Sequence, residues 1–134
     1  METMAPIRTT VQRPHRISLT AGPAAAAEAR SQVRAAICAW DVPVDPAVAV
    51  LLTSELVTNA LRHEAGRIIE LVVSCAYRQL QVDVYDTSPT MALQMDAPPG
   101  AETGGGLTLL ASLSSSWGYY RTPTGQAGYF TLMF

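Results

Sequence analysis

The chain has 134 residues, 49% hydrophobic and 15% charged, and a formal net charge of −2. These values predict one globular domain and exclude general disorder. Because no basic block follows the N-terminal arm, we expect no direct nucleic-acid binding, which depends on clustered positive charge. We also expect no membrane association and a cytoplasmic location, since the apolar runs are too short to span a bilayer and no secretory signal is visible.

The first half of the chain predicts a loose arm and two helices. Residues 1–16 contain prolines and arginines without periodicity and are expected to form a flexible arm. A short strand is expected at 17–20. Gly22-Pro23 then opens a helix, because proline suits a first turn. A second helix is expected at about 46–64, with Gly66 just past its end as a cap.

The second half predicts strands around a long loop. The expected elements are a strand at 67–77, a tight connection at Arg78-Gln79, a strand at 80–86, a loop at 87–106, a helix at 107–113 and a hairpin of 117–122 and 129–134. A loop of that length is commonly functional. The order predicts an α/β (α+β) fold, a two-layer sandwich of a mixed, mostly antiparallel sheet with helices on one face. Cys38 and Cys75 lack metal-like or redox-like spacing, so we expect two reduced, buried thiols.

The second helix places polar residues on a face that begins apolar. Leu51 and Leu52 start this face, Glu55 and Asn59 continue it at i and i+4, and His63 follows. A carboxylate and an amide packed against a sheet need partners or a wet cavity, because burying them unpaired is costly. The alternative is that this part of the helix emerges into solvent.

A similar contrast ends the strand at 80–86. Leu80, Val82 and Val84 share one side of the strand, and Asp86 lies on that same side. The alternative is a turn aspartate. Further along, Gly104-Gly105-Gly106 precedes the predicted helix, where backbone N–H groups can approach an anion. A flexible loop would also explain these glycines.

The three features occur in the order of a known family. Residues Glu55 to His63 resemble the N-box of the gyrase, chaperone and histidine-kinase (GHKL) ATPase superfamily, which has the Bergerat ATP-binding fold. Asp86 to Thr90 and Glu102 to Leu107 resemble its two glycine boxes. The short chain, Trp117-Gly118 and the final hairpin are similar to the anti-sigma-factor serine/threonine kinase branch. The resemblance covers residues 17–134, which would form the ATPase domain.

The resemblance implies a role for each matching residue. Asn59 would coordinate Mg²⁺, Glu55 would be the general base, and Asp86 would accept a hydrogen bond from the adenine amino group. The remaining ATP-binding residues would be His63, Ser88, Gly104, Gly105, Gly106 and Leu107. Residues 87–106 would form a nucleotide lid.

Three departures from the family pattern imply weaker nucleotide affinity. Ser88 and Thr90 replace the glycines of the first box. Gly105 stands where the second box often has an arginine that contacts phosphate. Gln126-Ala127 replaces a Lys-Thr pair, whose threonine supports the adenine-binding aspartate.

Two functions therefore remain open. The chain resembles an anti-sigma factor that binds a sigma factor and uses Mg-ATP to phosphorylate a serine or threonine of an antagonist protein. The alternative is a non-catalytic module that sequesters a partner with weak or no ATP turnover. A detached sensor-kinase domain is a weaker third reading, because the chain carries no phosphoacceptor helix pair. The resemblance also implies a homodimer through the N-terminal part of the sheet.

Overall fold

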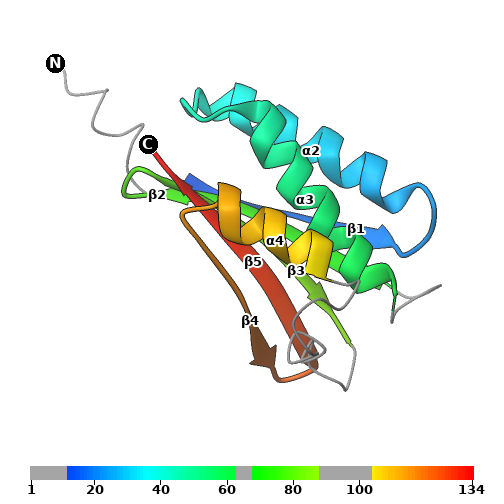
Figure 1. The fold of residues 1–134 in the computed structure, drawn as a ribbon. Helices are drawn as coiled ribbons and strands as arrows, with labels where there is room; N and C mark the ends of the chain where they lie inside the picture. The colour runs from blue at the N-terminus through cyan, green and yellow to red at the C-terminus, as the bar shows by residue number, and fades with distance from the viewer. Residues whose placement is uncertain (1–11, 63–67, 88–103) are drawn as a thin grey trace, which may run out of the picture.

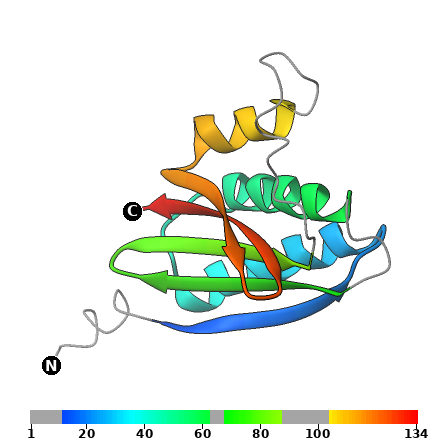
Figure 2. The same cartoon turned by 90° about the horizontal axis from the view of Figure 1, so that it is seen from below.

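The computed structural model describes residues 12–62, 68–87 and 104–134. In chain order their elements are β1 (Gln12–Thr20), α2 (Ala25–Trp40), α3 (Pro46–Leu61), β2 (Ile68–Ala76), β3 (Gln79–Asp86), α4 (Gly104–Leu113), β4 (Ser116–Thr122) and β5 (Gly125–Met133). The strands form one sheet in the order β1-β2-β3-β5-β4. The helices lie on one face of it (Figure 1). Figure 2 shows the sheet from its other side, called the open face here, which no described helix covers.

The predicted α+β fold with two layers is confirmed. The sheet differs from the mixed one predicted, because each described strand pairing is antiparallel. The connection between β1 and β2 explains part of this difference. The chain reverses on entering α2, on entering α3 and again on entering β2, so β2 runs opposite to β1 (Figure 1).

Both long helices have local sequence signals at one end. α3 begins at Asp45, whose carboxylate accepts the N–H of Ala47 at 2.9 Å, and Pro46 occupies the first turn. α2 ends at Asp41, which adopts a left-handed conformation with φ of 56°. Aspartate tolerates this conformation better than most residues. These caps mark where α2 ends and α3 begins.

The core lies between the helices and the sheet. It is built from small and branched side chains, and its largest fully buried members are Phe130, Leu52, Leu56, Ile69, Leu71, Leu80 and Leu110. The apolar face of α3 differs from the prediction at Leu51, which is 39% exposed. The buried stripe instead follows Ala49, Leu52, Thr53, Leu56, Val57 and Ala60. Glu55 and Asn59 flank this stripe and are half-buried.

Several element boundaries differ from the predictions. The predicted arm at 1–16 is too long, because residues 12–16 belong to β1, whose pairing with β2 extends to Gln12 opposite Cys75. Residues 1–11 lie outside the described residues. The β2–β3 connection is Tyr77-Arg78 rather than Arg78-Gln79, and both residues have positive φ, as a type I′ hairpin turn requires. α4 begins at Gly104 instead of Leu107.

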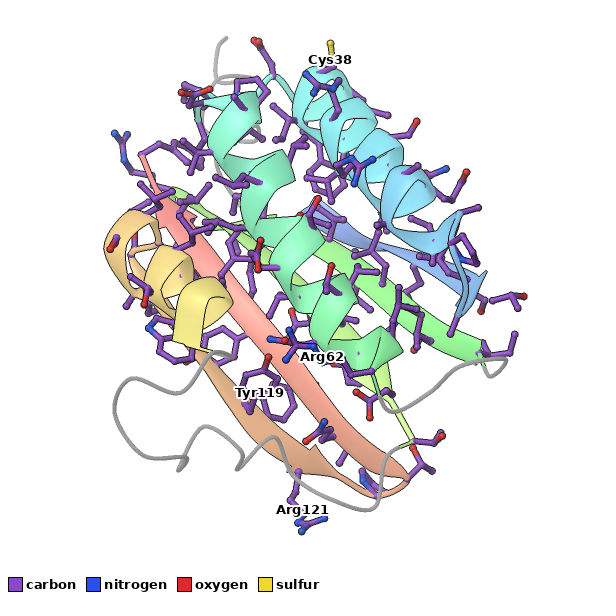
Figure 3. The ribbon with its side chains drawn as sticks, turned by 45° about the vertical axis from the view of Figure 1, so that its right-hand side comes forward. Cys38, Arg62, Tyr119 and Arg121 are labelled. Carbon is purple, nitrogen blue, oxygen red and sulfur yellow. The ribbon has the colours of Figure 1, made fainter. Side chains whose placement is uncertain are left out.

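The two cysteines differ in burial. Both are free thiols, and Cys75 is buried as predicted, which raises the pKa of its thiol. Cys38 is exposed, contrary to the prediction. It lies beside Ile37 but outside the inward stripe of α2, at the far end of the helix layer from Tyr119 (Figure 3). Among the described residues, no helix has both the length and the apolarity to cross a membrane.

Candidate functional site

Asn59 on α3 contacts a residue of the distant strand β4. Its Nδ2 donates a hydrogen bond to the Tyr119 hydroxyl at 2.8 Å. Tyr119 reaches α3 because residues alternate along β4, so that Trp117, Tyr119 and Arg121 pair with the helix-facing positions of β5. The polar part of α3 therefore has a specific partner across the helix–sheet interface.

Tyr119 lies among the predicted site residues. Burial raises the pKa of its phenol, the hydrogen bond from Asn59 opposes that shift, and the negative charge of Asp86 adds to it. Smaller effects come from Arg62, which lowers the pKa, and Glu55, which raises it. Figure 3 shows Tyr119 beside Arg62, between the end of α3 and β4. The hydroxyl is thus within electrostatic reach of both predicted carboxylates.

Glu55 precedes Asn59 by one helical turn. Its half-buried carboxylate engages in no hydrogen bond or ion pair with the described part of the chain. Glu55 and Asn59 therefore share one side of α3, as their spacing predicts.

Asp86 is buried at the end of β3. It is 6% exposed and shares the helix-facing side with the buried Leu80, Val82 and Val84, which confirms the predicted alternation. Gln126 lies opposite it on β5 and donates from Nε2 to Asp86 Oδ2 at 3.3 Å. Because Asp86 is buried and accepts a hydrogen bond from a side-chain amide, it differs from an ordinary solvent-exposed turn aspartate.

The remaining predicted residues are described only in part. Gly104, Gly105, Gly106 and Leu107 form the first turn of α4. A helix start can bind an anion through its free N–H groups, so this backbone fits the predicted phosphate role. His63 and Ser88 lie outside the described residues, as does the predicted lid apart from Thr87 and Gly104 to Gly106.

The residues fit a magnesium ion that is shared with a nucleotide. The described residues contain no group of three or more histidine, cysteine or acidic side chains able to hold a metal. Mg²⁺ in phosphate-transfer sites commonly takes one or two protein ligands and completes its shell with water and phosphate. A single amide oxygen from Asn59 matches that requirement.

The sequence does not predict two residues of the site, Tyr119 and Gln126. Tyr119 falls in a predicted hairpin strand, where its position two residues after Trp117 indicates that both side chains lie on the same face of the strand. Gln126 enters the prediction only as part of a missing Lys-Thr pair. The structure shows instead that its amide supports Asp86.

Comparisons with known proteins agree with this arrangement. The sequence model of the histidine kinase-like ATPase domain matches residues 19–131, which is most of the chain. The chain therefore belongs to the histidine kinase-like ATPase domain family, and the predicted family resemblance is confirmed. No curated protein matches it.

Twelve chains of solved structures also match. One is the crystal structure of the RsbU and RsbW domains of Rv1364c from Mycobacterium tuberculosis, at 21% identity and a TM-score of 0.64. The match covers 91% of this chain and 32% of the other, so the present chain spans about a third of that protein's solved length. This likeness shows a shared fold.

Proposed function

We propose that this chain is a cytoplasmic Mg-ATP-binding regulator of the anti-sigma type, which phosphorylates a serine or threonine of an antagonist protein. The observation that carries the proposal is the convergence of Asn59, Glu55 and Asp86 around Tyr119. Family membership supports ATP binding, and the fold shared with an RsbW domain supports the regulatory class. The sigma factor and antagonist as partners, and a homodimer, belong to the same proposal.

Asp86 and Asn59 hold the two ends of the nucleotide. The Asp86 carboxylate is buried and anchored by Gln126, so it offers a fixed acceptor for the adenine amino group. The Asn59 amide oxygen would be a ligand for Mg²⁺, a cation that would neutralise phosphate charge when bound. The glycines at the start of α4 offer backbone N–H groups to the phosphates.

Glu55 acts on the phosphate acceptor. In the transfer, the acceptor hydroxyl oxygen bonds to the γ-phosphorus while the bond between that phosphorus and ADP breaks. Glu55 accepts the hydroxyl proton, and ADP leaves with the electron pair of the broken bond. Positioning and charge neutralisation supply most of the catalysis in such reactions.

ATP binding is tested by thermal unfolding and by calorimetric titration with Mg-ATP. A ligand bound only by the folded state raises the unfolding temperature. Asp86→Asn should lower ATP affinity, because an amide has one acceptor oxygen where the carboxylate has two, and both Gln126 and adenine require an acceptor. Asp83→Asn makes the same change on the open face of the same strand and should leave affinity unchanged. Absence of any shift with wild-type protein at millimolar Mg-ATP would reject the ATP-binding proposal.

The non-catalytic alternative has one observation in its favour. Gly105 brings no side chain to the start of α4, where family members often carry a phosphate-binding arginine. A module of this kind would bind a partner and ATP without turnover. Transfer of labelled phosphate from ATP to candidate antagonist proteins separates the two functions, because a sequestering module retains partner binding and yields no labelled antagonist.

A further inference from the structure

We infer that Tyr119 is a positioning residue, whose hydroxyl fixes the Asn59 side chain so that its amide oxygen faces the Mg²⁺ of the bound nucleotide. The inference rests on the proposed ATP-binding function and adds to it a residue from β4. It concerns the orientation of a ligand atom rather than direct contact with the nucleotide.

The direction of the hydrogen bond carries the argument. Asn59 Nδ2 donates to the Tyr119 hydroxyl at 2.8 Å, so the nitrogen side of the amide points at the phenol. Because an amide is planar, with oxygen and nitrogen on opposite sides, Oδ1 then points away from Tyr119. Only this oxygen can coordinate a cation, since the amide nitrogen has no lone pair available to it. In the structure the hydroxyl accepts from Nδ2, and this contact leaves Oδ1 without engagement by Tyr119.

The position of the Tyr119 ring is itself fixed by packing. Gly128 lies directly opposite Tyr119 on β5. A Cβ at Gly128 would come within 2.7 Å of Tyr119 Cε2 and 3.1 Å of Leu56 Cδ2. The ring therefore occupies the space that a β5 side chain would take, next to the buried Leu56 of α3. A glycine at this strand position commonly marks such a close approach.

The surroundings of the hydroxyl match a role in the site. Tyr119 is within electrostatic reach of Asp86, Glu55 and Arg62, as the direction of each effect on the phenol pKa indicates. The hydroxyl thus contacts the proposed metal ligand on α3 and is within electrostatic reach of the proposed adenine acceptor on β3. Residues that orient a metal ligand commonly change metal affinity by about 10- to 100-fold when they are removed.

The test measures the Mg²⁺ dependence of ATP binding in Tyr119→Phe. This change keeps the ring over Gly128 and removes the hydroxyl. Calorimetric titrations with ATP at a series of Mg²⁺ concentrations, and in EDTA, give the ATP affinity with and without Mg²⁺. We expect the Mg²⁺ concentration that gives half of the maximal increase in ATP affinity to rise about tenfold or more. The ATP affinity in EDTA should be unchanged. Tyr129→Phe removes a phenolic hydroxyl from the open face and should retain the wild-type Mg²⁺ dependence.

Two further variants test that Tyr119 acts through Asn59. In an Asn59→Ala background, Tyr119→Phe should have no additional effect, because coupled residues are not additive. Gly128→Ala should displace the Tyr119 ring, whereas Tyr119→Phe only removes its hydroxyl, and both changes should shift the Mg²⁺ dependence in the same direction. Gly128→Ala also tests the inference if Tyr119→Phe does not fold.

The outcomes separate this inference from the proposed function. Wild-type Mg²⁺ dependence in Tyr119→Phe would overturn the inference and leave ATP binding intact. An equal loss of affinity with Mg²⁺ and with EDTA would also overturn it, because Tyr119 would then support the pocket without orienting the ligand. Failure of wild-type protein to bind ATP would overturn both.

Discussion

The Gln126 side-chain amide donates a hydrogen bond to the Asp86 carboxylate across the β3–β5 pairing, and both residues are buried. The contact joins the last residue of β3 to the start of β5. It places a neutral donor beside the carboxylate that we propose as the adenine acceptor. Gln126 thus contacts Asp86, a role that the family resemblance gives to a threonine at the next position.

Gln126→Leu should weaken ATP binding and destabilise the fold. The change keeps the side-chain volume but removes a donor to a buried carboxylate, which costs about 1–3 kcal/mol in free energy of unfolding. Urea unfolding measures the stability, and calorimetric titration with Mg-ATP measures the affinity. The matched control is Gln81→Leu, because Gln81 donates to Asp83 at 3.0 Å on the open face. The control should lose stability while retaining ATP affinity, so equal affinity losses in the two variants would contradict a specific role for Gln126.

Gly125→Ala should destabilise the end of β3. A Cβ at Gly125 would lie 2.1 Å from the Asp86 carbonyl oxygen and 2.6 Å from the Thr87 Cα. Both are backbone atoms, so the strands must separate to admit a methyl group. We expect a loss of about 1–3 kcal/mol or more, as for other overpacked sites, together with weaker ATP binding. Gly22→Ala is the control, since its Cβ would meet only the Thr20 carbonyl oxygen, at 3.9 Å, among the residues that the structure describes. Wild-type stability of Gly125→Ala in urea unfolding would contradict the steric argument.

The sequence predicts those parts of the site that depend on local periodicity. Glu55 and Asn59 share one side of α3 because they are four residues apart, and Asp86 is buried because β3 alternates. The pairing of Asn59 with Tyr119 is different, because these residues are 60 positions apart in the chain. Their contact depends on the register of β4 with β5 and on the space above Gly128, and neither follows from a local pattern.

Asp83 shows the same limit on the open face. Alternation places it with Gln81 and Tyr85 on the polar side of β3, yet it is only 5% exposed. Tyr120 of β4 donates to its carboxylate at 2.8 Å, and the Tyr120 ring packs edge-on against Tyr85. Burial without a covering helix thus arises from aromatic side chains of another strand. The pattern of a single strand cannot show it.

Glu55→Gln should bind ATP and fail to transfer phosphate. Glutamine preserves the shape of the side chain but accepts no proton at neutral pH, and general-base catalysis commonly contributes about 10²- to 10⁴-fold to rate. Calorimetry measures binding, and labelled phosphate on the antagonist measures transfer. Glu28→Gln, on α2, removes an equal charge outside the site and should keep the wild-type rate. Label transferred at the wild-type rate by Glu55→Gln would exclude Glu55 as the base.

Asp83→Asn should change how stability depends on pH. Burial raises the pKa of the Asp83 carboxyl above its ordinary value of 3.8, although hydrogen bonds from Tyr120 and Gln81 oppose the shift. The folded chain therefore keeps this proton to a higher pH than the unfolded chain. Between 3.8 and the raised pKa, the free energy of unfolding of wild type, relative to the variant, should fall with rising pH. The fall amounts to about 1.4 kcal/mol for each unit by which the pKa is raised.

Urea unfolding of both proteins across about pH 3 to 8 measures this difference. Subtracting the free energy of unfolding of the variant from that of wild type removes the contribution of the other acids, because independent sites contribute equally to both proteins. Glu70→Gln is the matched control, because it removes a half-exposed carboxylate from the same face, where Arg16 lies 3.6 Å away. The control separates a general loss of negative charge from the effect of burial. A stability difference between wild type and Asp83→Asn that stays constant or grows as the pH rises would show that burial does not control the titration of Asp83. The hydrogen bonds from Tyr120 and Gln81 would then outweigh the desolvation of the carboxylate.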